Sequence, residues 1–138
     1  MRLIKPFVIL FLLIAALACT QKSENKEKLK FNSDKEKNAI NLMLDSFNVA
    51  AGKADFDGYF NFYTDDAIFT GTDATERWDK KEFMVWAKPF FDRGKAWNFT
   101  ALKRNIYFSK SGDLAWFDEL LNTQMKICRG SGVLVKQG

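Results

Sequence analysis

Apolar residues recur at three- and four-residue spacing over residues 33–53, as they do on the buried face of a helix. The stripe consists of Ile40, Met43, Leu44, Phe47, Ala50, Ala51 and Ala54. Ser33 lies three residues before Glu36, which is the capping-box pattern of a helix start. We therefore predict a first helix over about residues 33–53.

A second, short helix is predicted after Gly52. Asp55 is a suitable cap for its start, and the polar pair Asp65 and Asp66 ends it. Its apolar face consists of Phe56, Tyr59, Phe60 and Tyr63.

A third helix is predicted from Asp79 to about Asp92. Its apolar stripe consists of Phe83, Trp86, Ala87, Phe90 and Phe91. Pro89 lacks an amide hydrogen and its ring crowds the preceding turn, so we expect it to kink or split this helix.

Strand patterns occupy most of the remaining chain. Residues 67–70 predict a short strand, and Gly71-Thr72-Asp73 predicts a turn after it. Beyond Trp97, apolar and polar residues alternate, as in a half-buried strand. We expect extended segments over 105–109, 114–123, 124–129 and 133–135, with turns at Ser111-Gly112 and Gly130-Ser131-Gly132. Helices followed by an antiparallel meander predict an α+β domain whose helices cover one face of the sheet.

The first 18 residues have the pattern of an export signal. Arg2 and Lys5 precede an apolar run over residues 7–18, which is shorter than the roughly 17 to 25 residues of a membrane-spanning helix. A buried core helix is the alternative. Ala16-Leu17-Ala18-Cys19 resembles a bacterial lipoprotein signal, although Ala16 stands where such signals usually have Leu. The resemblance implies cleavage before Cys19, its lipidation, and anchoring of the protein to a bacterial membrane in the cell envelope.

The polar segment that follows predicts a flexible tether over residues 19–33, ahead of one domain over residues 34–138. Leu29 and Phe31 are the apolar residues of the stretch from Thr20 to Lys35, too few to order it. The chain has 2 cysteines. If Cys19 carries lipid, Cys128 is a buried free thiol on a strand; the alternative is a secreted protein with a disulfide between them.

Composition narrows the possible functions. With 138 residues, 47% hydrophobic and 28% charged, the chain is a single globular domain. Its 14 Phe, 4 Trp and 3 Tyr suggest a core or cavity walled by rings. The absence of histidine excludes imidazole bases and the commonest zinc sites, so we expect no metal and no cofactor. The net charge of +4 falls when Arg2 and Lys5 are removed, and we expect no nucleic-acid partner.

Several short motifs, in this order, carry a family resemblance. They are Tyr63-Thr64-Asp65-Asp66-Ala67, Gly71-Thr72-Asp73, Pro89-Phe90-Phe91, Ala115-Trp116-Phe117 and Arg129-Gly130-Ser131-Gly132-Val133. Together they resemble the SnoaL-like group of the nuclear transport factor 2 superfamily. The resemblance implies a cone-shaped, curved antiparallel sheet packed on three N-terminal helices around an apolar pocket. Its members include isomerases, dehydratases, cyclases, hydrolases and binding or assembly modules, so the fold does not choose the chemistry.

The resemblance also implies one more strand than this sequence contains. Family members continue with a turn and a last strand inside the sheet, whereas this sequence stops at Gln137-Gly138. We therefore expect that the domain is incomplete and that residues 133–136 lack the partner that this last strand supplies in the family. Such an edge would make the isolated chain unstable or prone to pair with another chain.

Asp73 is the first candidate general base. It lies where SnoaL-like proteins often place polar pocket residues, with Glu76, Arg77 and Trp78 close behind. In an apolar cavity its pKa would be raised, and it could abstract a proton next to a carbonyl. Alternatively, Asp73 caps backbone amides of its turn. Arg77 could clamp an anionic substrate or simply be solvated.

Asp118 is the second candidate base, and Glu119 lies beside it on the same strand. Adjacent strand residues face opposite sides, so only one of the two carboxylates can face the pocket. If the face of Trp116 and Asp118 is concave, Asp118 is the acid or base. If Phe117 and Glu119 face inward, the assignment reverses.

Aromatic side chains are the remaining candidates for a ligand site. Tyr59, Tyr63 and Tyr107 could donate a hydrogen bond to a developing oxyanion, or be packing residues. We expect the ligand-binding set to comprise Tyr59, Tyr63, Arg77, Trp78, Trp86, Trp116 and Glu119.

Three functions follow from these patterns. The favoured one is an envelope-anchored domain that binds a small, largely apolar molecule in an aromatic-lined cavity. The second is an isomerase- or hydrolase-type enzyme with Asp73 or Asp118 as base, which predicts that Asp73→Asn or Asp118→Asn removes turnover but not binding. The third is an assembly module that forms a homodimer through its convex sheet face.

Overall fold

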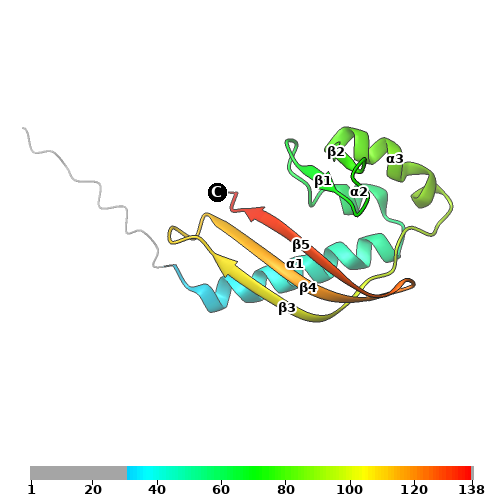
Figure 1. Cartoon of the computed structure of the whole chain (residues 1–138). Helices are drawn as coiled ribbons and strands as arrows, with labels where there is room; N and C mark the ends of the chain where they lie inside the picture. The colour runs from blue at the N-terminus through cyan, green and yellow to red at the C-terminus, as the bar shows by residue number, and fades with distance from the viewer. Residues whose placement is uncertain (1–30, 138) are drawn as a thin grey trace, which may run out of the picture.

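The computed structural model describes residues 31–137 and contains helices and antiparallel strands in the order α1-α2-β1-β2-α3-β3-β4-β5 (Figure 1). This arrangement confirms the predicted α+β class. The export signal, Cys19 and most of the expected tether lie outside the described residues. Within 31–137, no helix is long and apolar enough to cross a membrane.

Helix α1 covers Ser33–Gly52, as its apolar periodicity predicted. Its cap differs from the prediction. Asn32 is the N-cap, and its Oδ1 accepts hydrogen bonds from the amides of Asp34 and Lys35 at 3.1 Å. Ser33 is therefore the first helical residue and not the cap. The side-chain oxygen of Asn32, one residue before it, accepts from the free N–H groups of the first turn.

Helix α2 covers only Phe56–Phe60 and is followed by turns. Asp55 caps it as predicted, with its Oδ1 accepting from the Gly58 amide at 3.0 Å. Strand β1, Ile68–Thr70, pairs with β2, Arg77–Asp79, which sequence analysis missed. Their register places Phe69 opposite Trp78.

Helix α3 covers Lys80–Asp92 and begins with a capping box between Asp79 and Glu82. It continues through Pro89, so of the two predicted effects, a kink or a split, the split does not occur. Pro89 lies exposed in the last turn, where its missing amide removes one helical hydrogen bond at the end of the helix.

Strands β3, Thr100–Phe108, β4, Leu114–Thr123, and β5, Lys126–Val135, form an antiparallel meander. The turn between β4 and β5 lies at Gln124 and Met125, and β5 runs straight through Gly130-Ser131-Gly132. The predicted turn at these glycines was therefore wrong. A Cβ at Gly132 would lie 2.8 Å from Phe117 Cε1, so glycine here makes room for a ring on the neighbouring strand.

The structure has two parts, one in the upper and one in the lower half of Figure 1. Helix α1 runs along the three-stranded sheet, and α2 and α3 pack with the β1-β2 hairpin. Among the described residues, β5 pairs only with β4 and β1 only with β2. The main core lies where α1, α2 and α3 meet, and it consists of Ala50, Ala51, Tyr59, Phe60, Phe83, Ala87 and Phe91.

Candidate functional site

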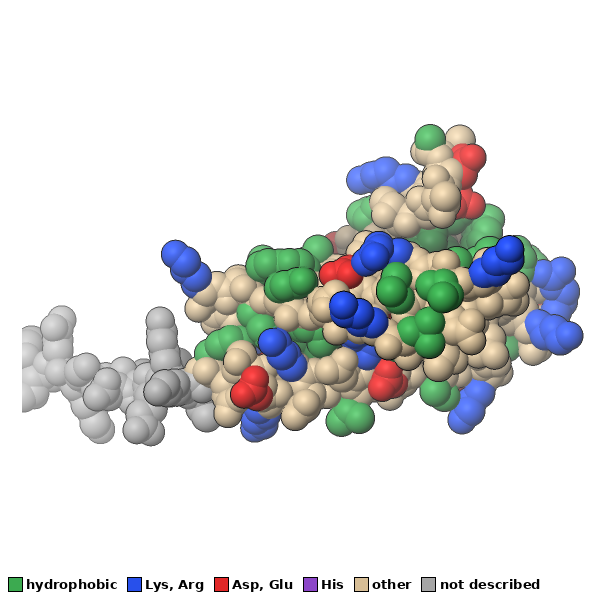
Figure 2. Space-filling model, turned by 60° about the horizontal axis from the view of Figure 1, so that its bottom comes forward, with side chains coloured by type: hydrophobic (Ala, Val, Ile, Leu, Met, Phe, Trp, Pro, Cys, Tyr) green, Lys and Arg blue, Asp and Glu red, His purple; other side chains and the backbone are tan. Residues whose placement is uncertain are grey.

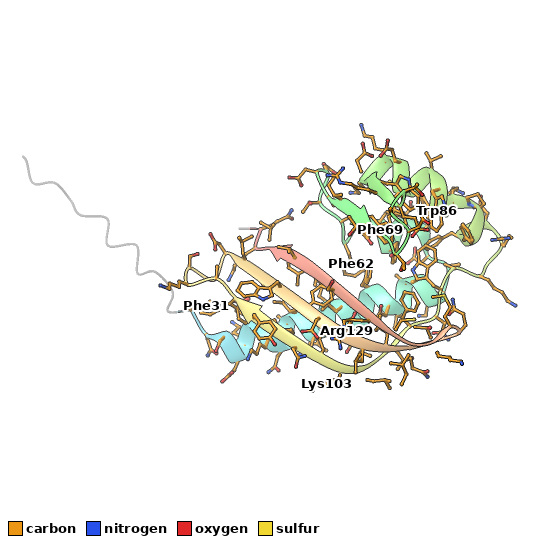
Figure 3. All side chains as sticks on the ribbon, viewed as in Figure 1. Phe31, Phe62, Phe69, Trp86, Lys103 and Arg129 are labelled. Carbon is orange, nitrogen blue, oxygen red and sulfur yellow. The ribbon has the colours of Figure 1, made fainter. Side chains whose placement is uncertain are left out.

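A cluster of aromatic rings joins α1, α2, α3 and the β1-β2 hairpin. Phe83 lies at its centre, almost fully buried, with its ring stacked on Phe69 at 4.0 Å between centroids. Trp78 and Trp86 of the same cluster are also stacked, with 4.9 Å between their ring centroids. Figure 3 shows Phe69 and Trp86 in this part of the molecule and Phe62 between it and the sheet. The structure thus brings together four of the expected ligand-binding residues, Tyr59, Tyr63, Trp78 and Trp86.

The rings of this cluster pack closely on one another. Two hollows are found among the described residues, and Phe60 of the cluster lines one of them. One of about 250 Å³ lies between α1 and β3 and is lined by Lys37, Asn41, Arg104, Asn105, Ile106 and Tyr107. The other, of about 460 Å³, lies between α2 and α3 and is lined by Asp57, Phe60, Asn61, Asp65, Lys80, Lys81 and Met84. The aromatic content therefore reflects a packed core more than a ring-lined void.

Two tyrosine hydroxyls form the polar feature of the cluster. Tyr59 Oη and Tyr63 Oη are hydrogen-bonded at 3.2 Å, and Phe47 of α1 stacks on Tyr59 at 4.4 Å. Burial raises the pKa of Tyr63 to about 12. Burial also raises the pKa of Tyr59, and the neighbouring Tyr63 adds to this shift, whereas a hydrogen bond with Trp97 opposes it. Both hydroxyls are therefore neutral donors at physiological pH.

A second polar group lies between α1 and the inner face of the sheet. Arg104 Nε donates to Glu119 Oε2 at 2.7 Å, and both side chains are 6% exposed. Arg104 Nη1 donates to Asn41 O at 3.0 Å and to Asp45 Oδ1 at 3.1 Å. Arg104 Nη2 and Asn48 Nδ2 are buried and have no hydrogen-bond partner among the described residues. Asn48, Arg104 and Glu119 are hereafter the inner polar group.

Sequence analysis identified Glu119 but missed Arg104 and Asn48. Arg104 lies two residues before Ile106, so the alternation along β3 already placed both on one face. Asn48 lies four residues after Leu44 and three before Ala51 in the predicted apolar stripe of α1. A polar residue inside an apolar stripe indicates a buried polar group, so the sequence pattern could have identified Asn48.

Asp118 faces the opposite side of the sheet, which corrects its assignment as a pocket base. Phe117 and Glu119 face α1, whereas Trp116 and Asp118 lie on the outer face. Arg129 Nη1 donates to Asp118 Oδ1 at 2.7 Å, and Asn105 Nδ2 lies 3.2 Å from the same oxygen. Trp116 is 45% exposed and stacks on Tyr107.

Asp73 is exposed in its turn and lies in no apolar cavity. Its Oδ1 accepts from Thr75 Oγ1 at 2.6 Å and from the Thr75 amide at 2.8 Å. These hydrogen bonds, that of the side chain first, lower the pKa of Asp73 below its ordinary value. The expectation of a raised pKa was wrong, and the turn-capping alternative is confirmed. Arg77 is exposed on β2.

No group of acidic or cysteine side chains in residues 31–137 is arranged to hold a metal ion. Cys128 lies half-buried on β5, with its Sγ 3.5 Å from Thr123 Oγ1. The Tyr59–Tyr63 pair and the inner polar group are two arrangements of polar side chains that could bind a ligand.

Solved structures with a similar fold support this description. An NTF2-like protein of unknown function from Pseudomonas putida KT2440 has a TM-score of 0.65 at 16% identity, over 77% of this chain and 80% of that one. A structure named after the association domain of calcium/calmodulin dependent protein kinase II, from Xanthomonas campestris, has a TM-score of 0.52 at 16% identity, over 78% and 79% of the two chains.

A protein with a cystatin-like fold from Nostoc punctiforme PCC 73102 has a TM-score of 0.51 at 16% identity, over 72% of this chain and 75% of that one. No curated protein matches the sequence. The family model of the SnoaL-like domain matches residues 40–138, which is more than half of the chain. The expected cone-like α+β fold is confirmed by these relatives, and the chain belongs to the SnoaL-like domain family.

Proposed function

We propose that this protein binds a small, largely apolar molecule next to the aromatic cluster, on the side that faces the sheet. The observation that carries the proposal is the Tyr59–Tyr63 hydroxyl pair, 3.2 Å apart among packed rings. Either hydroxyl can donate in this pair; when Tyr59 donates to Tyr63 Oη, the Tyr63 O–H remains to donate to a ligand. Tyr63 is half-buried, so this donor lies at the edge of the cluster.

Binding is better supported than general-base catalysis. Asp73 is exposed and its pKa is lowered, so it lacks the environment of a base that works near neutral pH. Asp118 is held by Arg129 on the outer face of the sheet. Glu119 is on the inner face, but its carboxylate is already paired with Arg104. For an enzymatic function, Glu119 is thus a better candidate for the general base than Asp73 or Asp118.

Delivery to the cell envelope is part of the proposal. It is supported by Arg2, Lys5 and the apolar run over residues 7–18, which precede Ala16-Leu17-Ala18-Cys19. Two acyl chains on Cys19 would anchor the domain stably, since one chain alone is marginal. Mass spectrometry of the mature protein measures the lipid, the termini and any copurified compound together. An unmodified chain that still begins at Met1 would contradict the anchoring.

The binding test uses cumene, an apolar aromatic probe, and the amide NMR spectrum of the full-length protein. We expect saturable shifts that concentrate around Phe47, Tyr59 and Tyr63. Shifts that rise linearly with cumene, or that spread evenly over the sheet, would contradict the proposal. Lys110 lies in the exposed turn between β3 and β4, so its amide serves as an internal control.

The outer face of the sheet supports a second function, assembly into a homodimer. Tyr107 and Trp116 stack at 5.9 Å and are 48% and 45% exposed, and Val133 beside them is 69% exposed. Figure 2 shows hydrophobic side chains in groups between basic ones on the face that it turns forward. One similar structure is named after an association domain, which fits an assembly role.

Light scattering on the full-length protein tests this second function. A dimer that Trp116→Lys converts to a monomer supports assembly through the outer face. A monomer in the unmodified protein eliminates it. Lys95→Glu, in the exposed loop after α3, is the control for a nonspecific effect of changed surface charge.

A further inference from the structure

The outer face of the sheet carries an exposed apolar patch at one end. The strand register places Tyr107, Trp116 and Val133 in one row across β3, β4 and β5, and Leu114 and Val135 in the next row. These five side chains, hereafter the outer apolar patch, are between 41% and 69% exposed. Exposed apolar surface with a polar rim indicates contact with another protein or with a membrane.

The chain enters the domain at the same end of the sheet. Phe31, just before α1, packs edge-on against Phe108 of β3, with 5.0 Å between the ring centroids (Figure 3). Gly112, in the turn between β3 and β4, is buried against the same ring. Tyr107 and Leu114 of the outer apolar patch lie on the two strands that this turn joins. The patch and the entry point of the chain are therefore both at the β3–β4 turn.

A short segment separates this entry point from the expected lipid. Cys19 lies 12 positions before Phe31. Fully extended, such a segment reaches at most about 40 Å, because one residue spans about 3.3 to 3.6 Å. If Cys19 carries lipid, Phe31 stays within this distance of the membrane. A tether of this length gives the patch a high effective concentration at the lipid surface.

Basic side chains accompany the outer apolar patch. Lys110 lies in the exposed β3–β4 turn, and Lys103 lies on the same face as Tyr107, four residues earlier on β3. Neither lysine forms an ion pair in the part of the chain that the structure describes. The segment over residues 19–30 adds four lysines and two glutamates. Anionic phosphate headgroups attract such basic residues.

The acidic side chains of this face leave the two lysines available. Asp118 is paired with Arg129, at 2.7 Å between Oδ1 and Nη1. Asp113 in the turn accepts hydrogen bonds from the hydroxyls of Ser109 and Ser111. A second copy of the chain would put like charges on both sides of the contact, which is unfavourable. The charges therefore favour an anionic lipid surface over a second copy.

We propose that the outer apolar patch docks on a lipid surface with anionic phosphate headgroups. This inference rests on the envelope delivery in the proposed function and adds the orientation of the domain. Trp116 and Tyr107 have an apolar body and a polar tip, which suits the boundary between headgroups and acyl chains. Lys103 and Lys110 contact the phosphates. Helix α1 covers the other face of the sheet, so docking does not displace it.

Fluorescence quenching by brominated phosphatidylcholine tests the inference, because a tryptophan must reach the acyl chains to be quenched. Half of each vesicle is brominated phosphatidylcholine, and the other half is either phosphatidylglycerol or ordinary phosphatidylcholine. The full-length protein is used, and its 4 tryptophans all lie beyond residue 30. We expect quenching in the phosphatidylglycerol vesicles, and loss of most of it in the neutral vesicles or at high salt.

Trp116→Phe identifies the tryptophan that is quenched. It keeps an aromatic side chain in the patch and removes the indole. Trp78, Trp86 and Trp97 belong to the aromatic cluster and remain in this variant. We expect most of the quenching to be lost. Quenching that persists in Trp116→Phe overturns the inference.

Two lysine variants test the charge contribution with the same change of net charge. Lys110→Glu lies beside the outer apolar patch and should reduce the quenching by at least about half. Lys95→Glu, in the exposed loop after α3, is the matched control and should leave it unchanged. Equal effects of the two variants overturn the inference.

The outcomes also separate docking from the proposed anchoring. Equal quenching in anionic and neutral vesicles, or none in either, overturns the docking. A dimer that is not quenched assigns the patch to a second copy and also overturns it. Mass spectrometry reports the lipid on Cys19 independently. A chain without this lipid that is still quenched through Trp116 supports the docking and contradicts the anchoring, and a lipidated chain without quenching does the reverse.

Discussion

Arg104 on β3 and Glu119 on β4 are directly opposed in the sheet, and Arg104 Nε lies 2.7 Å from Glu119 Oε2. Cross-strand neighbours on one face have closely spaced side chains, which brings the two charges into contact. The pair lies under α1, where both side chains are 6% exposed. It contrasts with Asp118 and Arg129, a pair on the outer face whose side chains are 32% and 63% exposed.

Removing Glu119 is expected to destabilise the protein far more than removing its neighbour. Glu119→Ala leaves the buried guanidinium with only the exposed Asp45 as a charged partner, and we expect a loss of about 3 kcal/mol in the free energy of unfolding. Asp118→Ala breaks a partly exposed pair and should cost at most about 1 kcal/mol. Urea unfolding measures both. Equal losses would contradict the burial difference between the two faces.

The tyrosine pair predicts a loss of stability at alkaline pH. The pKa of Tyr63 is raised from 10.0 to about 12, so the folded state keeps its proton where the unfolded chain loses it. The stabilisation is complete below about pH 10 and is lost as pH rises through about 12, with a slope of up to about 1.4 kcal/mol per pH unit per proton.

Unfolding midpoints measured between about pH 9 and 12 test this dependence. Tyr63→Phe should make the alkaline loss smaller, and Tyr59→Phe with Tyr63→Phe should make it smaller still, because the pKa of Tyr59 is also raised. Tyr107→Phe removes a hydroxyl outside the cluster and is the control. An unchanged pH dependence in the double variant would refute the assignment of the alkaline loss of stability to the two tyrosines.

Asp73 is expected to titrate as a turn carboxylate. Its hydrogen bonds from Thr75 lower its pKa, so NMR titration of its side chain should give a value below the ordinary 3.8. Thr75→Val removes the hydroxyl donor and keeps the amide donor, and we expect the pKa to rise toward 3.8. A value raised above the ordinary one in the unmodified protein would restore Asp73 as a candidate base.

The helices were predictable because their apolar periodicity and caps are local. β2 was missed because it is three residues long and carries one apolar side chain, Trp78. The face of β4 could not be chosen from sequence, because Trp116 and Leu120 on one side are as apolar as Phe117 and Leu121 on the other. Its orientation is set by α1, which covers one side only.

The candidate site was predictable only in part. Tyr59 and Tyr63 were expected because of their place in the helical pattern. Composition suggested that aromatic rings line a cavity. Composition alone cannot distinguish a ring-lined cavity from a core of packed rings, and the rings here form a packed core. Arg104 was not recognised, because its partner Glu119 lies on another strand and only the pairing register brings them together.

Glycine at position 132 is expected to be required for the packing of β5 on β4. It lies opposite Phe117 in the register, and a Cβ there would lie 2.8 Å from Phe117 Cε1. Alanine at this position would displace the ring from the inner face of the sheet, and we expect a loss of about 1 to 3 kcal/mol. Ser131→Ala, the exposed neighbour on the same strand, should change stability by less than about 0.5 kcal/mol. Gly132→Ala combined with Phe117→Leu, a smaller side chain, should recover part of the loss. If the single Gly132→Ala variant is as stable as the unmodified protein, the glycine is not required to accommodate the ring.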